Sequence, residues 1–197
     1  MRCARFSLLQ ISMNEITEYT PPGILFINGA PGSGKTTVAR MIAGDAPKGA
    51  HIDGDEIHNL VVGGRIHPPG EPEDEVERQL YLRFRNMALL ADSFFQSGIF
   101  PVLETCISTQ KYLDYLLSRI TSRPLAMIVL VQPLTIALER DKKRPEKTVA
   151  HLHADKYDEM CDELGDTGLW INNGEMTPEQ TKNEIIRRAF TEGIIRR

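Results

Sequence analysis

The residues with the clearest chemical pattern are a run of consecutive positions that can cradle phosphate groups. They contain the spacing G-x-x-x-x-G-K-[S/T], in which glycines let the backbone turn tightly and aim successive N–H groups at phosphate oxygens. Lys35 is expected to reach the β- and γ-phosphates, and Thr36 to give its hydroxyl to Mg²⁺. The sequence therefore predicts that the chain binds ATP and Mg²⁺. The residues expected to bind the nucleotide are Gly29, Ala30, Pro31, Gly32, Ser33, Gly34, Lys35, Thr36 and Thr37.

Two acidic residues follow the next short apolar segment, where phosphoryl transfer to an alcohol needs carboxylates. Asp53 and Asp55 stand on either side of Gly54, directly behind residues 50–52. One carboxylate is expected to orient Mg²⁺ through water, and another to accept the proton of an attacking hydroxyl group. An Asp with its ordinary pKa of about 3.9 is ionised at neutral pH and can serve in either role. The alternative is that one of them only caps the helix that follows, because Asp is a favoured N-cap residue.

Two arginines later in the chain are candidates for a lid over the nucleotide. Arg140 and Arg144 are four residues apart near the end of an expected helix, beside Pro145. Cations that close over ATP can grip the transferring phosphoryl oxygens and exclude water. The alternative is a solvated basic helix end, which the helix dipole favours.

Four other side chains are candidates for binding the molecule that accepts the phosphoryl group. Glu104 follows an expected strand and is placed to assist either the metal or the acceptor. His58 lies three residues after Asp55 on an expected helical turn, so we expect it to line the acceptor pocket. Arg78 and Arg85 lie one heptad apart on a long helix, where they either face an anionic or polyhydroxyl acceptor or form a solvated face.

Alternating strand and helix signals connect these residues. Short apolar runs predict strands at residues 24–27, 50–52, 99–103, 125–131 and 169–171. Helical periodicity and end signals predict helices at residues 37–43, 56–62, 73–97, 111–120, 133–143, 150–163 and from 178 onward, after a capping box of Thr177 and Gln180. This alternation predicts a parallel sheet covered by helices, whose strand ends bring the phosphate loop and the acidic pair to one crevice. The Gly- and Pro-rich segment 63–72 is expected to be a mobile excursion over that crevice.

Length and composition favour one domain and argue against two classes of partner. The chain has 197 residues, a formal net charge of −4 and a pI near 5.8, so it lacks the basic footprint of a nucleic-acid-binding protein. No apolar run reaches the roughly 18 residues that a membrane span needs. The three cysteines have no metal-type spacing and suit a reducing cytoplasm. We expect a soluble cytoplasmic protein, with a disordered or artefactual leader at residues 1–22 and one domain at residues 23–197.

The order of these features resembles the small P-loop kinases, a group that includes shikimate, gluconate and adenylylsulfate kinases and the chloramphenicol phosphotransferase-like enzymes. The resemblance spans residues 24–190, and residues 144–151 and 168–171 are most similar to the chloramphenicol phosphotransferase-like branch. It implies an α/β, single-domain P-loop NTPase with a five-stranded parallel sheet flanked by helices and a short arginine-containing lid at about residues 141–150. The chain departs from the pattern at Asn172-Asn173, where an acid is expected, and in segment 63–72, which lacks the known sugar-acid and shikimate acceptor motifs.

The resemblance also implies roles for individual residues. It makes Asp55 the base that contacts the acceptor hydroxyl, and Asp53 a ligand of Mg²⁺. Arg144 corresponds to the lid arginine, with Arg140 nearer the adenine or the phosphates. Together with Lys35, these residues imply ATP-dependent transfer of the γ-phosphoryl group to a hydroxyl of a small molecule, such as an antibiotic, a nucleoside or a sugar-like metabolite.

Two other functions fit the same motifs. One is a toxin-like or RNA-end kinase that applies the same chemistry to a larger acceptor, against which the net charge speaks. The other is a regulatory switch that binds ATP without phosphorylating anything. Asp55→Asn separates kinase from switch, because it should abolish transfer by a kinase and leave the partner interaction of a switch intact. The sequence leaves the oligomeric state open.

Overall fold

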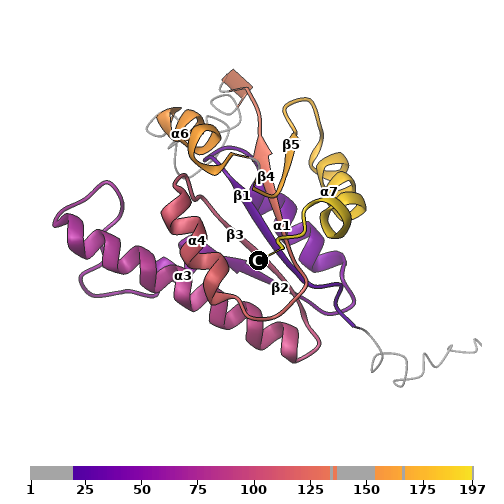
Figure 1. Cartoon of the computed structure of the whole chain (residues 1–197), viewed down its shortest axis with the longest axis horizontal. Helices are drawn as coiled ribbons and strands as arrows, with labels where there is room; N and C mark the ends of the chain where they lie inside the picture. Colours follow the sequence, from indigo (N-terminus) through magenta and orange to yellow (C-terminus); the bar gives the residue numbers. More distant parts are fainter. Residues whose placement is uncertain (1–19, 134, 137–153, 166, 197) are drawn as a thin grey trace, which may run out of the picture.

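The centre of the molecule is a five-stranded sheet whose strands all run parallel. The computed structural model describes residues 20–133, 135–136, 154–165 and 167–196. The sheet has the order β2-β3-β1-β4-β5 (Figure 1). In that order the strands are β2 (Gly49–Asp53), β3 (Phe100–Thr105), β1 (Ile24–Gly29), β4 (Leu125–Val131) and β5 (Leu169–Asn172). The first strand in sequence therefore lies in the middle, and the loop after it opens at the centre of the sheet's carboxyl edge.

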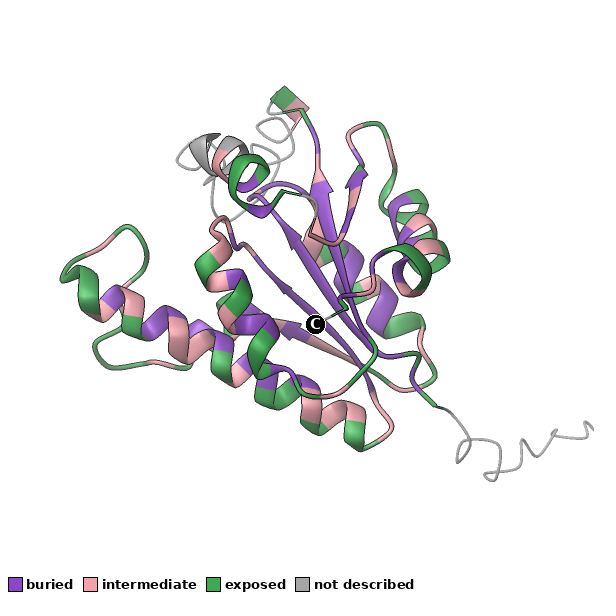
Figure 2. Ribbon diagram, in the orientation of Figure 1, coloured by how far each residue is buried: buried purple, intermediate pink, exposed green. Residues whose placement is uncertain are grey.

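Helices cover both faces of this sheet. The helices packed on one face are α3 (Glu73–Gln96), α4 (Gln110–Arg119) and α6 (Ala154–Leu164). Those on the other face are α1 (Lys35–Asp45) and α7 (Pro178–Glu192), while the short α2 (Gly54–Asn59) follows β2. Buried residues follow the strands and the inward stripes of the helices, and exposed residues lie on the outer helix faces (Figure 2).

The central strands are apolar on both sides because each face of the sheet has its own core. In β1, Ile24 and Phe26 join the core under α3 and α4, whereas Leu25 and Ile27 join the core under α1 and α7. Successive strand residues point to opposite faces, so a sheet covered on both faces produces an unbroken apolar run. Burial of each such side chain contributes about 1.5–3 kcal/mol to stability.

Residues after α7 complete the edge of the sheet beside β4. Strand β5 pairs with the second half of β4, from Ile128 onward. Beside the first half, Met127 N–H donates to the Gly193 carbonyl at 2.8 Å, and Ile195 N–H donates to the Leu125 carbonyl at 2.9 Å. This antiparallel contact occupies the place that a longer β5 would take.

The segment before α3 is fastened to that helix. Ile66 N–H donates to Gln79 Oε1 at 3.1 Å, and Gln79 Nε2 donates to the Gly64 carbonyl at 2.8 Å. His58 Nε2 lies 3.1 Å from the Ile66 carbonyl oxygen. The first half of the predicted excursion is therefore held in place, and with the N-terminal end of α3 the segment projects beyond the sheet (Figure 1).

The elements predicted from the sequence occur throughout the described residues. All five predicted strands are present, and the capping box forms at the start of α7, where Gln180 N–H donates to Thr177 Oγ1 and Thr177 N–H donates to Gln180 Oε1. Residues 1–19 of the expected leader lie outside the described part, as do the expected lid and its Arg140 and Arg144. In the part of the chain that is described, no helix is both long and apolar enough to cross a membrane.

Candidate active site

The phosphate loop joins β1 to α1 at the centre of the carboxyl edge. Gly34 is the N-cap of α1 and has a φ of +86°, a left-handed conformation that a side chain would strain. A Cβ on Gly29 would lie 2.6 Å from Ser33 Oγ and 2.9 Å from the Leu130 carbonyl oxygen, so this position also has no room for one. Among the described residues no side chain caps α1. Its first N–H groups are therefore available to an anion in the crevice.

Two buried amide side chains hold the carbonyl groups of this loop. Gln132 Nε2 donates to the Gly32 carbonyl at 2.8 Å, and Asn173 Nδ2 donates to the Ser33 carbonyl at 2.9 Å. Both amides come directly after strands, β4 and β5. Because a trans peptide points its C=O and N–H in opposite directions, the second bond turns the Gly34 N–H away from Asn173.

A third buried amide fastens the segment after β3 beside the loop. Asn28 Nδ2 donates to the Ile107 carbonyl at 2.9 Å, and Ile107 N–H donates to Asn28 Oδ1 at 2.8 Å. The side chain of Asn28 thus makes the pair of bonds that a neighbouring backbone would make. Glu104 and Cys106, which precede Ile107, are thereby held next to the end of β1.

The ends of β2 and β3 bring three titratable side chains together. We call His51, Asp53 and Glu104 the strand-end cluster, since one possible ligand atom from each lies within 4.8 Å of the other two. Asp53 and Glu104 are opposite each other in the parallel register. Lys35 Nζ lies 4.0 Å from Glu104 Oε2, and Thr36 is close enough to Glu104 to lower the pKa of its carboxyl group. Groups predicted for phosphate, metal and acceptor binding therefore meet at one place.

Asp53 is both an N-cap and a member of this cluster. Its Oδ1 accepts from the backbone N–H of Asp55 at 2.8 Å and of Glu56 at 3.4 Å, which is the capping role that the sequence left open. Its Oδ2 lies 4.0 Å from Arg40 Nη2, too far for a hydrogen bond. The capping bonds fix the carboxylate and leave its second oxygen for a cation.

Glu104 is almost completely buried, with 2 % of its side chain exposed. The pKa of Glu104 is raised to about 7, chiefly by burial. The charges of Asp53 and Asp55 add to the rise, while Lys35 and Thr36 oppose it. A cation bound at this carboxyl group would displace the proton, since metal ligands must be deprotonated.

The second acid of the pair contacts an arginine whose side chain is mostly buried. A Cβ on Gly54 would lie 2.6 Å from Thr105 Oγ1, so glycine lets α2 start in contact with β3. The side chain of Asp55 is 86 % exposed, and its Oδ1 lies 3.4 Å from Nη1 of Arg83, which is only 10 % exposed. Burial lowers the pKa of Arg83, and the charges of Asp55 and Cys106 oppose this change. Arg83 therefore contacts, from the protein interior, the carboxylate that faces solvent.

Three other predicted site residues do not join this group. His58 is buried and fastens the segment before α3 through the Ile66 carbonyl, and burial lowers the pKa of its imidazole. Arg78 is paired with Glu75 one turn away on the exposed face of α3, at 2.6 Å. Arg85 is exposed on the same helix. The two arginines therefore have the environment of a solvated helix face, because charged side chains on such a face pair locally.

Four residues of the site were not among those predicted from the sequence, namely His51, Arg83, Gln132 and Asn173. Arg83 had a detectable signal, since it comes three residues after the buried Leu80 and four before the buried Met87. His51 precedes Asp53 by two residues, so the period of a strand puts both on one side. The two amides had no local signal, because they bind the phosphate loop across 100 and 140 residues of sequence.

The donor set of the site fits a divalent cation. Hydroxyl and carboxylate oxygens, the ligands that Mg²⁺ prefers, are supplied by Thr36, Asp53 and Glu104. The third member of the strand-end cluster, His51, adds a ring nitrogen. Burial lowers the pKa of His51 below its ordinary value, so the imidazole is neutral at neutral pH.

Comparisons with known proteins find similarity to this chain in structure alone. Neither protein families nor curated protein sequences give a match. The tunicamycin resistance protein of Deinococcus radiodurans is 19% identical, with a TM-score of 0.63 over 90% of this chain and 99% of that chain. A sugar kinase from Janibacter sp. HTCC2649 is 19% identical, with a TM-score of 0.62 over 85% of this chain and 93% of that chain. A gluconokinase from Sinorhizobium meliloti 1021 is 18% identical, with a TM-score of 0.61 over 85% of this chain and 91% of that chain.

At these identities the likeness concerns the fold. The chain has the α/β fold of the P-loop small-molecule kinases, with a five-stranded parallel sheet flanked by helices. The predicted α/β fold with its five-stranded parallel sheet is thereby confirmed, while the expected lid lies outside the described residues. What the site acts on is a separate question, because one fold supports many activities.

Proposed function

We propose that this protein is an ATP- and Mg²⁺-dependent phosphotransferase that moves the γ-phosphoryl group to a hydroxyl group of a small molecule. The proposal is carried by the meeting of three kinds of group at one edge of the sheet. These are the N–H groups of the phosphate loop, the cation Lys35 and the carboxyl groups of Asp53, Asp55 and Glu104. Phosphoryl transfer depends mainly on positioning and on charge stabilisation, which such a set supplies. The fold shared with a sugar kinase and a gluconokinase supports the same function.

The nucleotide side of the site is suited to hold negative charge. In the proposed complex, the N–H groups of the phosphate loop and Lys35 bind phosphate oxygens. Thr36, Asp53 and Glu104 hold Mg²⁺, which when bound neutralises charge on the phosphates. Asp53 is already oriented by its capping bonds, so it contributes without rearranging.

On the acceptor side, Asp55 is the proposed general base. The hydroxyl oxygen of the acceptor forms a bond to the γ-phosphorus, and its proton passes to the Asp55 carboxylate. The bond between that phosphorus and the bridging oxygen breaks, and ADP leaves with the electron pair. Arg83 positions the base, because its guanidinium contacts the same carboxylate from the buried side.

The lid arginines complete the proposed machinery. On the resemblance of their motif, we assign Arg144 to the transferring phosphoryl group and Arg140 to the adenine or the phosphates. Closure of such a lid excludes water and so favours transfer to the acceptor over hydrolysis.

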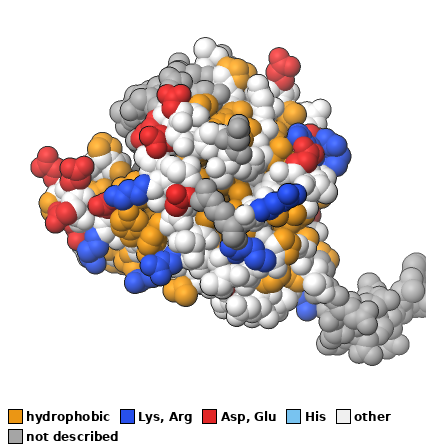
Figure 3. Space-filling view, in the orientation of Figure 1, with side chains coloured by type: hydrophobic (Ala, Val, Ile, Leu, Met, Phe, Trp, Pro, Cys, Tyr) orange, Lys and Arg blue, Asp and Glu red, His pale blue; other side chains and the backbone are white. Residues whose placement is uncertain are grey.

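The proposed acceptor is an antibiotic, a nucleoside or a sugar-like metabolite rather than a nucleic acid. On the face drawn in Figure 3, Lys and Arg side chains stand in small separate groups among acidic and apolar ones. A nucleic acid is bound mainly through a continuous basic surface. The net charge of −4 also disfavours the RNA-end kinase.

The proposal is tested by ATP consumption with Mg²⁺ across a panel of antibiotics, nucleosides, sugar acids and short RNAs. Lys35→Ala is the control for contaminating activity, and mass spectrometry of the product locates the new phosphate. Turnover with a small molecule that disappears in Lys35→Ala supports the proposal. Turnover with RNA alone would favour the RNA-end kinase. ATP binding without acceptor-dependent turnover would favour the regulatory switch.

A further inference from the structure

The imidazole of His51 has a ring nitrogen that the protein leaves without a hydrogen bond. His51 lies in β2, two residues before Asp53, and its side chain is 14 % exposed. Its Nε2 is buried and has no hydrogen-bond partner among the described residues. The carboxylate oxygen Glu104 Oε1 lies 3.8 Å from it, beyond hydrogen-bond distance. A buried polar nitrogen left in this state costs stability, so a ligand at this position would recover that cost.

The spacing of the strand-end cluster suits one shared cation. At metal–ligand distances of about 2.1 Å, neighbouring ligands of an octahedral cation lie about 3 Å apart and opposite ligands about 4.2 Å apart. The ligand atoms of His51, Asp53 and Glu104 lie within 4.8 Å of one another. Small side-chain rotations therefore bring all three within reach of one ion.

We propose that Nε2 of His51 is a direct ligand of the divalent cation held by Asp53 and Glu104, giving a mixed nitrogen and oxygen site that prefers Mn²⁺ or Co²⁺ to Mg²⁺. The inference rests on the metal site of the proposed function and deepens it. Mg²⁺ takes oxygen ligands, whereas affinity for imidazole rises along the first transition series. A nitrogen ligand thus shifts the preference of the site without changing its position.

The groups around the imidazole permit this arrangement. Ligation by Nε2 requires the proton on Nδ1, which Arg40 Nε now approaches at 3.5 Å. That contact is at the limit of hydrogen bonding, and Arg40 has a better partner in Glu56, at 3.0 Å. The side chain of Arg40 is 57 % exposed, so it can turn fully to Glu56 when the imidazole binds a cation.

The alternative is an outer role, in which His51 only hydrogen-bonds to Glu104 while oxygen atoms hold the metal. This alternative predicts a different nearest neighbour of the ion. Direct ligation places an imidazole nitrogen in contact with the cation, and the outer role does not. A spectroscopic measurement of the bound ion therefore separates the two arrangements without any assay of turnover.

The test is pulsed electron paramagnetic resonance of Mn²⁺ bound to the full chain with a non-hydrolysable ATP analogue. We expect coupling to phosphorus from the nucleotide and to nitrogen from a bound imidazole, with the nitrogen pattern changing when the histidines are labelled with ¹⁵N. His51→Asn should remove the nitrogen coupling. The matched control His67→Asn, which also removes one histidine, should keep it. Because the ¹⁵N experiment uses the unmodified chain, a spectrum without nitrogen coupling overturns the inference even if His51→Asn fails to fold.

Metal preference provides a second readout. We expect the ratio of Mg²⁺ to Mn²⁺ dissociation constants, measured calorimetrically with the same analogue, to fall by about tenfold in His51→Asn. Phosphorus coupling without nitrogen coupling would overturn the inference and leave the proposed function standing. Nitrogen coupling that persists in His51→Asn would also overturn it. Failure of Mn²⁺ and nucleotide to bind together would overturn both this inference and the proposed function.

Discussion

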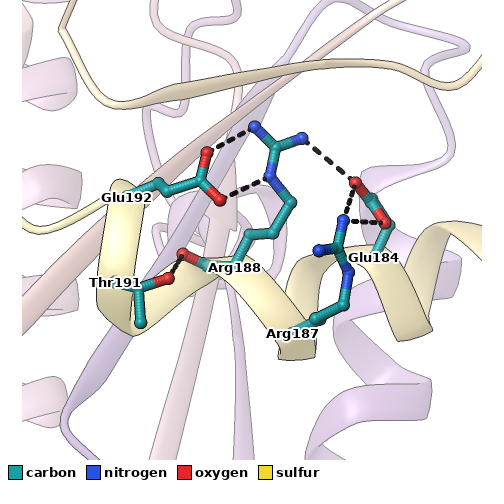
Figure 4. A network of polar contacts seen from close by, with 5 residues as sticks. All are labelled: Glu184, Arg187, Arg188, Thr191 and Glu192. Carbon is teal, nitrogen blue, oxygen red and sulfur yellow. Dashed lines mark hydrogen bonds and ion pairs between the residues drawn. The ribbon is translucent and has the colours of Figure 1, made fainter.

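Two groups of charged side chains in this protein differ in how completely their members are paired. On α7, the side chains of Glu184, Arg187, Arg188 and Glu192 form what we call the α7 network, with N···O distances of 2.6–3.0 Å (Figure 4). Each arginine has a carboxylate partner and each carboxylate an arginine. These side chains are between 24 and 67 % exposed.

The strand-end cluster has the opposite character. Glu104 is 2 % exposed, yet its contacts with Lys35 Nζ and His51 Nε2 are 4.0 and 3.8 Å long. Its pKa of about 7 shows the cost of holding the charged form there. The groups are close enough to influence one another and too far apart to satisfy one another.

The comparison distinguishes charges that are paired within the protein from charges that are arranged for a ligand. An exposed ion pair contributes about 0–1 kcal/mol, so the α7 network is complete but contributes little to stability. A buried charge without a full set of partners lowers stability. Such clusters are characteristic of functional sites, where a bound molecule supplies the missing partners. Four substitutions test this distinction.

The largest effect is expected at the base. Asp55→Asn should lower kcat for phosphoryl transfer by about 10²–10⁴-fold, because the amide cannot take the hydroxyl proton. ATP affinity should stay the same, since Asp55 lies on the acceptor side. Product formation and nucleotide binding, measured separately, check both statements. The neighbouring variant Glu56→Gln is the control, and equal loss in both variants would contradict the assignment.

The next effect concerns the stability of the protein without metal or nucleotide. The pKa of Glu104 is about 7 in the folded chain and 4.5 ordinarily, so the folded state binds this proton more tightly. The contribution of this protonated carboxyl group to the free energy of unfolding is fully present below pH 4.5 and is lost as the pH rises through 7. The difference between the two pKa values corresponds to about 3 kcal/mol in the free energy of unfolding.

As the pH rises from 4.5 to 8, the free energy of unfolding of Glu104→Gln should therefore increase by about 3 kcal/mol relative to that of the wild type. The reason is that the amide does not titrate. Urea unfolding at several pH values measures the difference. Parallel stability curves for the two proteins would show that the folded environment does not shift Glu104.

A smaller effect is expected where an amide holds the phosphate loop. Asn173→Asp replaces the donor to the Ser33 carbonyl with a carboxylate, which repels it. A lost bond of this kind costs about 1–3 kcal/mol, or roughly 5–150-fold in ATP affinity. Asn172→Asp is the matched control, because Asn172 Oδ1 accepts from Gly174 N–H at 3.0 Å and a carboxylate keeps that bond. Equal ATP affinities of the two variants would refute the role of Asn173.

The smallest effect is expected in the α7 network. Arg188→Ala removes the contacts with two carboxylates, those of Glu184 and Glu192. It should nevertheless lower the free energy of unfolding by no more than about 1 kcal/mol. That corresponds to a fall in Tm of about 2–4 °C. Differential scanning calorimetry measures it, and ATP affinity should not change. A loss of several kcal/mol would remove the contrast between the two groups.

The sequence predicted the fold well because its signals are local. Each strand is a short apolar run and each helix has its own period and end signals, as at the capping box of Thr177 and Gln180. The sheet order and the contact between Gly193 and Met127 depend on partners far away in sequence, and no local pattern reports them.

The site was predictable to the extent that its residues are adjacent in the chain. The phosphate loop and the pair Asp53 and Asp55 lie within short segments whose order indicates their chemistry. On α3, the expectation favoured Arg78 because of its spacing from other charged residues, whereas burial singles out Arg83. An arginine between buried positions is the more informative signal, since it must have a partner inside the protein.

The long-range bonds of the phosphate loop bear on how the protein is made on the ribosome. The motif is complete at Thr36, yet β1 needs β3 and β4 as neighbours, and the loop carbonyls need Gln132 and Asn173. Synthesis proceeds from the N-terminus, and non-local contacts form slowly. A nascent chain that ends before Asn173 therefore carries the whole motif without the bonds that shape it. We expect ATP to assist folding only after β5 has left the exit tunnel.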